Sequence, residues 1–233
     1  MKKRHLSRDL IRQNARLRTS DSGAYDTRGL AWTALDLLGG AVVPSLTVVL
    51  TTKGCSWARS DGCTMCGYIA DSNPDAQASD IQTQFNEVFA RYGKAFKIIK
   101  LFTSGSFLDE AELPIDVRNH ILSELRGTPK VIIESRPEFV TSEICEDIAR
   151  QNEHIEVAIG LETSNDRIRN NHINKGFAFR DFVKASEASR ANGFTVKAYL
   201  LLKPPYLTEM QALEAPTRTT PVCFSPLLHQ YIS

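Results

Sequence analysis

The feature of this sequence that most constrains its fold is an alternation of short apolar runs with amphipathic stretches from Val42 onward. The apolar runs are rich in Val, Ile and Leu without clean alternation, which is typical of strands buried on both faces. The order βαβαβαβαβ requires parallel strands with helical crossovers. We predict strands at 45–50, 97–102, 130–134, 155–161 and 195–202. We predict helices that open at Ser79, with Gln82 completing a capping box, and that cover 116–126, 141–151 and 179–192.

Either a barrel or an open doubly wound sheet fits this α/β order, and both gather ligands at the carboxyl ends of the strands. After residue 209 the pattern fails, because Pro216, Pro221 and Pro226 interrupt the sequence and no sixth apolar run follows. One explanation is an irregular tail that covers the apolar edge left by the last strand. The explanation we favour is that the chain is truncated or shifted out of frame near residue 215.

The formal net charge of +1 hides an uneven distribution. Residues 1–18 hold seven basic side chains and one acid, whereas the rest of the chain is net acidic. A basic segment of this kind fits the phosphates of an RNA, and the alternative is a solvated basic helix face. No apolar run is long enough to span a bilayer, and no secretory signal follows the charged start. We therefore expect a cytoplasmic protein with no membrane partner.

Three of the five cysteines lie within twelve residues, directly after the first predicted strand. Cys55, Cys63 and Cys66 have the spacing C-x7-C-x2-C. Three thiolates can bind three irons of a [4Fe–4S] cluster and leave the fourth iron open to a small chelating ligand. A structural zinc needs four protein ligands, and no histidine lies nearby in the sequence. We favour the cluster over zinc or unligated cysteines, and we expect Cys145 to be a small core residue.

The cysteine pattern, with Met65 just before the third cysteine, resembles the radical S-adenosylmethionine (SAM) superfamily. Four further elements of the sequence resemble motifs of that superfamily at successive strand ends. Residues 102–109 (FTSGSFLD) are similar to its glycine-rich motif, which contacts the SAM amino group. Residues 133–138 (IESRPE) and 159–163 (IGLET), the latter followed by Asn-Lys-Gly at 174–176, resemble elements of the Elongator/MiaB-type branches. Residues 199–205 (YLLLKPP) stand where those enzymes end the fifth strand.

Within the superfamily, the residues of these motifs are most similar to those of the radical SAM enzymes of archaeosine biosynthesis (RaSEA). The resemblance implies a partial (β/α)6 TIM-like barrel of about five βα units, incomplete at its C-terminal end. It implies a [4Fe–4S] cluster and SAM as cofactors, and an electron donor. The substrate implied is tRNA carrying a lysine adduct of preQ0 at position 15, whose lysine carbon–nitrogen bond is cleaved to form archaeosine. The implied protein partner is the archaeosine synthase subunit that transfers the lysine.

The resemblance also implies which residues bind SAM, all at predicted strand ends. The turn at 104–106 offers backbone carbonyls and hydroxyls to an ammonium group, two glutamates accept hydrogen bonds from hydroxyl or amino groups, and two basic residues pair with the SAM carboxylate. The predicted SAM contacts are Ser104, Gly105, Ser106, Glu134, Arg136, Glu162 and Lys175.

Each of these residues has an alternative interpretation. Gly105 can serve only as a turn, and Arg136 can be a surface residue held by the proline that follows it. Glu162 follows an apolar run, so its carboxylate is partly buried and needs a partner. Lys175 follows a polar stretch and can be a solvated charge, and Lys197 can point into the barrel mouth or reach the surface.

These expectations divide the chain into a basic extension (1–29), a radical SAM core (30–214) and an irregular tail (215–233). The function we favour is a lyase-type, tRNA-modifying radical SAM enzyme. The alternatives are a radical SAM enzyme for another tRNA site or a small molecule, and a metal-binding fragment that is not catalytic because its barrel is incomplete.

Overall fold

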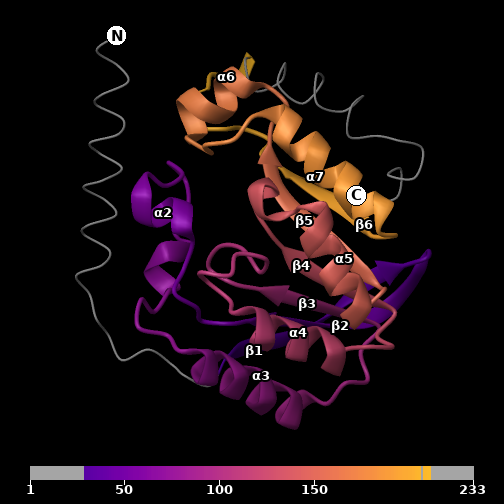
Figure 1. Cartoon of the computed structure of the whole chain (residues 1–233). Coiled ribbons are helices and arrows are strands. Elements are labelled where there is room, and N and C mark those ends of the chain that lie inside the picture. Colours follow the sequence, from indigo (N-terminus) through magenta and orange to yellow (C-terminus); the bar gives the residue numbers. More distant parts are fainter. Residues whose placement is uncertain (1–28, 206, 211–233) are drawn as a thin grey trace.

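The computed structural model describes residues 29–205 and 207–210 and contains one six-stranded sheet in the sequential order β1-β2-β3-β4-β5-β6 (Figure 1). The strands are β1 (Leu30–Leu38), β2 (Ala41–Val49), β3 (Ile98–Phe102), β4 (Lys130–Glu134), β5 (Ile155–Glu162) and β6 (Thr195–Leu200). The longer helices are α3 (Ala78–Tyr92), α4 (Ile115–Glu124), α5 (Ser142–Gln151) and α7 (Phe179–Ala191). Short helical segments are α2 (Ser56–Ser60), η1 (Tyr68–Asp71), η2 (Pro137–Phe139), α6 (Asp166–Ile168) and the π-helix η3 (Arg169–Ile173).

Strands β2 to β6 are parallel, as predicted, and each pairs with the next in sequence. Each right-handed crossover adds the next strand on the same side of the strand before it. All connecting helices therefore lie on one face of the sheet. Figure 1 shows α5 and α7 in front of the later strands and α3 below the first ones, and the apolar sides of α3, α4, α5 and α7 form the main core with the sheet. The sheet is therefore part of a singly wound barrel, and the doubly wound alternative is wrong.

The sequence interpretation assigned no strand before residue 42, but the structure has an antiparallel hairpin there. β1 pairs with β2 along its whole length, from Leu30 opposite Val49 to Leu38 opposite Ala41. Gly39 and Gly40 form the turn, and both have positive φ angles (58° and 83°). A two-residue turn of this kind favours glycine, so the Gly-Gly pair was the sequence signal for the hairpin.

The ends of the helices differ slightly from the predictions. α3 begins at Ala78, and the Asp80 carboxylate accepts a hydrogen bond from the backbone N–H of Gln77, so the capping box predicted from Ser79 is wrong. α5 begins one residue after Thr141, whose hydroxyl caps it by accepting from the N–H of Ile144. Cys145 on α5 is fully buried in the main core, as predicted.

Two edges of the sheet stay unpaired within the described residues, β1 and β6. The edge strand β6 corresponds to the strand predicted at 195–202. All of the predicted basic extension except Gly29, and the whole of the predicted irregular tail, lie outside the described residues, and the domain boundaries stay predictions. In the part of the chain that the structure describes, no helix is both long and apolar enough to cross a membrane.

Candidate radical SAM site

A cavity of about 650 Å³ lies at the carboxyl edge of the sheet. Parallel strands in adjacent register end at the same edge, so residues that follow β3, β4 and β5 in the sequence meet there. Of the ten residues predicted to bind the cluster or SAM, all but Ser106 line this cavity. They are Cys55, Cys63, Cys66, Ser104, Gly105, Glu134, Arg136, Glu162 and Lys175.

Ser106 lies behind the cavity wall. Its side chain is 1% exposed, and its hydroxyl accepts a hydrogen bond of 3.1 Å from the backbone N–H of Arg136. Ser106 therefore joins the ends of β3 and β4 to each other, and its contact with SAM stays a prediction.

The three cavity cysteines lie on one loop, residues 55–66, here called the cysteine loop, which includes α2. None of them forms a disulfide. Burial raises the pKa of the Cys55 thiol and raises that of Cys63 to about 11, so both sulfurs must lose a proton to bind a metal. Over the described residues, no three His, Cys, Asp or Glu side chains converge on a single metal position. In a [4Fe–4S] cluster each thiolate binds a different iron, so three thiols spread along one cavity wall fit that group.

The cysteine loop is fastened to the segment that follows β5. The Trp57 indole N–H donates to the backbone carbonyl of Asn174 (2.8 Å), and the Asn174 side-chain amide donates to the carbonyl of Gly62 (2.7 Å). The backbone N–H of Thr64 donates to the carbonyl of Ile173 (2.8 Å). Asn174 has a φ of 58°, a left-handed conformation that asparagine tolerates better than most residues. Segments more than 100 residues apart thus position the cysteines before any metal is bound.

Gly176 makes this contact possible, and replacing it tests the contact. A Cβ at Gly176 lies 2.6 Å from the Trp57 ring, whereas a Cβ at Gly193 meets nothing within 4 Å. The two glycines have nearly equal φ angles, 78° and 80°, so alanine causes the same backbone strain at both. We expect Gly176→Ala to lower the free energy of unfolding by about 1 to 3 kcal/mol more than Gly193→Ala, measured by urea denaturation. Equal losses for the two variants contradict the close Trp57 contact.

Arg136 is a buried residue, and the surface alternative is wrong. Its side chain is 8% exposed and lies between two rings, 5.3 Å from the Trp57 centroid and 5.5 Å from that of Phe177. Its guanidinium pairs with Glu138 and donates a hydrogen bond of 2.8 Å to the backbone carbonyl of Lys175. Arg136 therefore connects the end of β4 to the cysteine loop and to the segment after β5.

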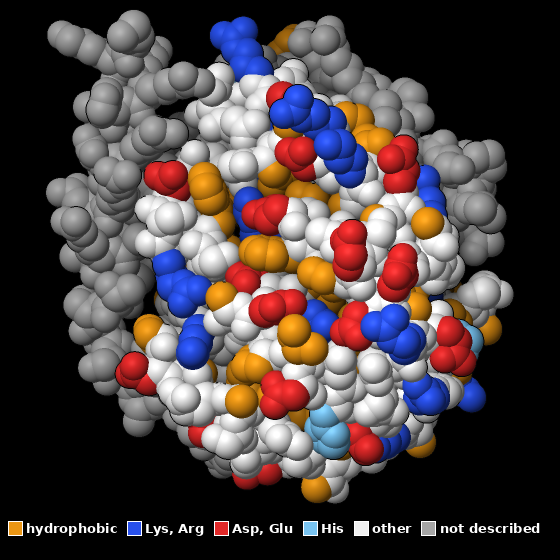
Figure 2. All heavy atoms as spheres, viewed as in Figure 1, with side chains coloured by type: hydrophobic (Ala, Val, Ile, Leu, Met, Phe, Trp, Pro, Cys, Tyr) orange, Lys and Arg blue, Asp and Glu red, His pale blue; other side chains and the backbone are white. Residues whose placement is uncertain are grey.

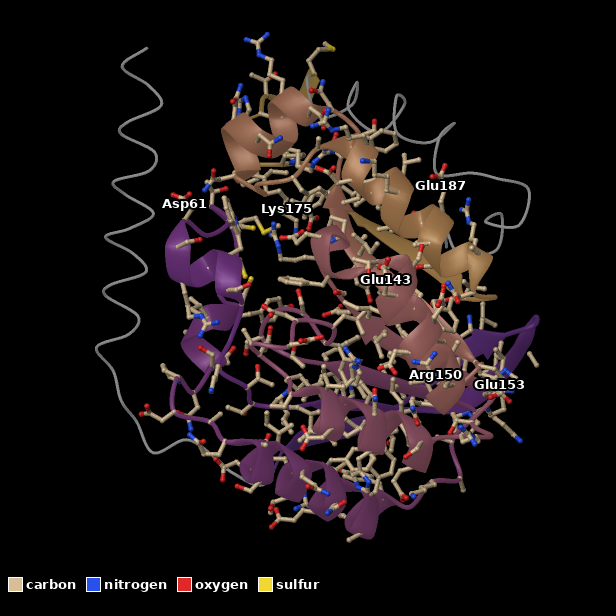
Figure 3. All side chains as sticks on the ribbon, viewed as in Figure 1. Asp61, Glu143, Arg150, Glu153, Lys175 and Glu187 are labelled. Atoms are coloured by element: carbon tan, nitrogen blue, oxygen red, sulfur yellow. The ribbon has the colours of Figure 1, made fainter. Side chains whose placement is uncertain are left out.

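Glu162 and Lys175 form a buried ion pair at the cavity. Their charged atoms are 2.9 Å apart, and their side chains are 8% and 13% exposed. Figure 3 shows Lys175 pointing into the space beside the cysteine loop, where yellow sulfur atoms also lie. Glu162 has a φ of 63°, next to an irregularity in the pairing of β5 with β6. Strained backbone of this kind persists where the surroundings require it, which is common at functional sites. The partner that the buried Glu162 carboxylate requires is thus Lys175.

Glu134 and Tyr199 form a half-buried pair, on the sheet face opposite the helices. Burial raises the pKa of Glu134 to about 7, although a hydrogen bond from Tyr199 and the charge of Lys175 oppose the shift. Burial also raises the pKa of Tyr199. The Lys197 ammonium lies over the Tyr199 ring, 5.5 Å from its centre. Tyr199 lines the cavity but was not predicted individually, because the sequence does not show which way a strand residue faces.

The raised pKa of Glu134 predicts a pH-dependent stability. Between its ordinary pKa of 4.5 and about 7, the unfolded chain releases the proton that the folded chain retains, so stability falls as pH rises through this window. Glu134→Gln removes the ionisation. We expect the variant to gain about 2 to 3 kcal/mol of unfolding free energy over the wild type between about pH 4 and pH 8, measured by urea denaturation of metal-free protein.

The control for this prediction is Glu110→Gln, which changes an exposed glutamate on the neighbouring segment. A stability difference between Glu134→Gln and the wild type that stays constant across this pH range contradicts the burial of an ionisable carboxyl at the cavity.

The fold, the three cysteines on one cavity wall and the strand-end residues around them are the features of one class of protein. The Radical SAM superfamily profile matches residues 49–215, more than half of the chain, so this protein belongs to the radical SAM superfamily. Membership implies a [4Fe–4S] cluster and SAM as cofactors.

More particular relatives are two archaeosine synthase beta subunits. The chain is 42% identical over 212 residues to that of Methanosarcina acetivorans, covering 88% of this chain and 60% of the relative. It is 40% identical over 194 residues to that of Thermococcus kodakarensis, covering 78% of this chain and 59% of the relative. The chain thus spans about 60% of the length of these relatives.

A solved structure shares the fold. The radical SAM methyltransferase TsrM from Kitasatospora setae superposes with a TM-score of 0.51 at 12% identity, covering 76% of this chain and 33% of TsrM. At this identity the likeness concerns the fold alone, and it agrees with an open, mostly parallel α/β sheet that forms part of a barrel.

Proposed function

We propose that this chain carries the radical SAM core of an archaeosine-forming enzyme. In this reaction the lysine adduct of preQ0 in tRNA loses its lysine by carbon–nitrogen bond cleavage. The observation that carries the proposal is the single cavity that brings Cys55, Cys63 and Cys66 together with the ends of β3, β4 and β5. The similarity to archaeosine synthase beta subunits supports the substrate class.

The residues of the chain have distinct tasks in this proposal. The three cysteine thiolates hold the cluster, and the turn that contains Ser104 and Gly105 receives the amino group of SAM. When both are bound, the cluster and SAM supply a 5′-deoxyadenosyl radical. The protein orients the substrate, excludes water and maintains the charge balance of the cavity through the Glu162–Lys175 pair.

The partners follow from the same proposal. The beta-subunit names of the relatives support a second subunit, the one that transfers lysine, and the chemistry requires an electron donor. On the face that Figure 2 shows, acidic and basic side chains are interspersed over the helices, and no single-sign patch stands out among the described residues. We assign contacts with tRNA phosphates to the basic segment at 1–18, which is outside the described residues, because phosphates attract clustered Lys and Arg. We place the reaction in the cytoplasm, where free cysteines such as these stay reduced.

The test is anaerobic reconstitution of the purified chain with iron and sulfide, followed by SAM and dithionite. We expect the visible absorption of an iron–sulfur cluster and the formation of 5′-deoxyadenosine. With tRNA that carries the lysine adduct, we expect archaeosine in the nucleoside digest. Roughly one zinc per chain without sulfide contradicts the enzyme and favours a metal-binding fragment. A purified chain that forms 5′-deoxyadenosine, together with a gene-deletion strain whose archaeosine content is unchanged, assigns the radical chemistry to another substrate.

A further inference from the structure

Glu112 is a buried carboxylate directly behind the candidate site. It lies between β3 and α4, is 1% exposed and does not line the cavity. One of its oxygens accepts a hydrogen bond of 2.6 Å from the hydroxyl of Thr52, which leads from β2 into the cysteine loop. The other accepts a hydrogen bond of 2.6 Å from the backbone N–H of Ser106, in the turn after β3. Glu112 therefore joins the segment before the first cysteine to the glycine-containing turn.

Gly105 packs between Glu112 and the cysteine loop so closely that a side chain does not fit there. A Cβ at this position lies 2.3 Å from a carboxylate oxygen of Glu112 and 2.5 Å from the Cα of Cys55. The same glycine lines the cavity on its other side. A displacement of Glu112 thus moves the cavity wall relative to Cys55.

The charge behind this turn has no counter-charge in the described part of the chain. Neither Glu112 nor its acidic neighbour Asp109 forms an ion pair there, and one oxygen of the buried Asp109 carboxylate has no hydrogen-bond partner. Burial and the nearby Asp109 raise the pKa of Glu112, and only uncharged donors from Thr52, Ser106 and Thr103 oppose this shift. A buried carboxylate without a cation favours binding of a positive group nearby, because the attraction is weakly screened there.

We infer that Glu112 is a positioning residue for SAM, which holds the turn at Gly105 against the cysteine loop and favours the cationic amino end of SAM in front of it. This inference rests on the proposed function, since it takes SAM as the ligand of the cavity. Glu112 contacts neither the cluster nor SAM, and acts through the backbone of the turn.

The first test compares Glu112→Gln with Glu110→Gln. Glutamine keeps the size of Glu112 but offers one acceptor oxygen instead of two and carries no charge. Glu110 is exposed, so its replacement removes the same charge two residues away without a buried hydrogen bond. In reconstituted protein we expect Glu112→Gln to raise the Kd of SAM about tenfold, measured by equilibrium dialysis, with unchanged iron and sulfide per chain. For Glu110→Gln we expect the wild-type Kd.

The second test uses Thr52, in case Glu112→Gln folds poorly. Thr52→Val removes the hydroxyl that donates to Glu112 and keeps the shape of the side chain, whereas Thr52→Ser keeps the hydroxyl. We expect Thr52→Val to raise the Kd of SAM about threefold and Thr52→Ser to restore it, with the iron content of both unchanged. In the Glu112→Gln background, Thr52→Val has less effect than in the wild type, because the bond it removes is already disrupted.

Four outcomes overturn the inference. A wild-type Kd of SAM for Glu112→Gln refutes the inference and leaves the proposed function standing. An equal Kd of SAM for Thr52→Val and Thr52→Ser has the same meaning. Loss of iron and SAM binding in parallel with a lower melting temperature assigns Glu112 to folding only. A wild-type chain that binds neither a cluster nor SAM refutes the proposed function and this inference with it.

Discussion

Replacing Cys55, Cys63 or Cys66 by alanine is expected to remove the iron–sulfur absorption and the cleavage of SAM together. Each thiolate would hold a different iron, so the loss of one leaves a site that binds the cluster incompletely. We expect 5′-deoxyadenosine formation to fall by more than about a hundredfold, since loss of an outer partner of a metal ligand already costs up to that much. The measurements are iron and sulfide per chain and the rate of 5′-deoxyadenosine release with dithionite.

The matched control is Cys145→Ala. This substitution also removes one cysteine, but Cys145 is fully buried in the main core on α5 and does not line the cavity. We expect it to retain wild-type iron and sulfide per folded chain. Iron and sulfide at the wild-type level in Cys63→Ala, confirmed after gel filtration, would show that the cavity cysteines are not the cluster ligands.

The second large effect is expected at the Glu162–Lys175 pair. Lys175→Ala leaves the Glu162 carboxylate buried without a partner, and an uncompensated buried charge is strongly destabilising. We expect a loss of about 3 to 5 kcal/mol in the free energy of unfolding of metal-free protein, measured by urea denaturation. The double variant Glu162→Gln with Lys175→Met is expected to recover most of this loss, because it removes both charges and keeps the side-chain volumes.

Lys94→Ala is the control for burial. Lys94 pairs with Glu124 at 2.6 Å, but the two side chains are 46% and 45% exposed. An exposed pair contributes about 1 kcal/mol or less, so the same Lys→Ala change is expected to have a small effect there. Similar losses for Lys94→Ala and Lys175→Ala are incompatible with a structural role for the buried pair.

The parallel strands and the helices between them were predictable, because strands buried on both faces leave continuous apolar runs and amphipathic helices leave a period near 3.6 residues. The β1–β2 hairpin was missed, although the Gly39–Gly40 turn marked it, because the apolar residues of β1 do not follow one face. Of its large apolar side chains, Leu30, Trp32 and Leu35 are all exposed. Because the apolar residues of β1 are exposed, its sequence lacks the apolar pattern that predicts a buried strand.

The candidate site was predictable to the extent that it follows the strand ends. Cys55 follows β2 and Glu134 ends β4, and both strands run parallel to β3 between them, so the two residues lie at the same edge of the sheet. Glu112 was not predictable, because it lies in a connection between β3 and α4 and nothing in its local sequence distinguishes it from the exposed Glu110. Only its burial against Thr52 and Gly105 separates the two glutamates.

By itself the sequence determined the class of fold, the three-cysteine loop and the edge of the sheet where we propose that the cofactors bind. These depend on order and spacing, which are properties of the chain. The tertiary structure alone decided that Lys175 neutralises Glu162, that Arg136 lies between two rings and that Glu112 supports the glycine turn. Such pairings join segments far apart in the chain, and a buried charge acquires its partner only when packing excludes water from both.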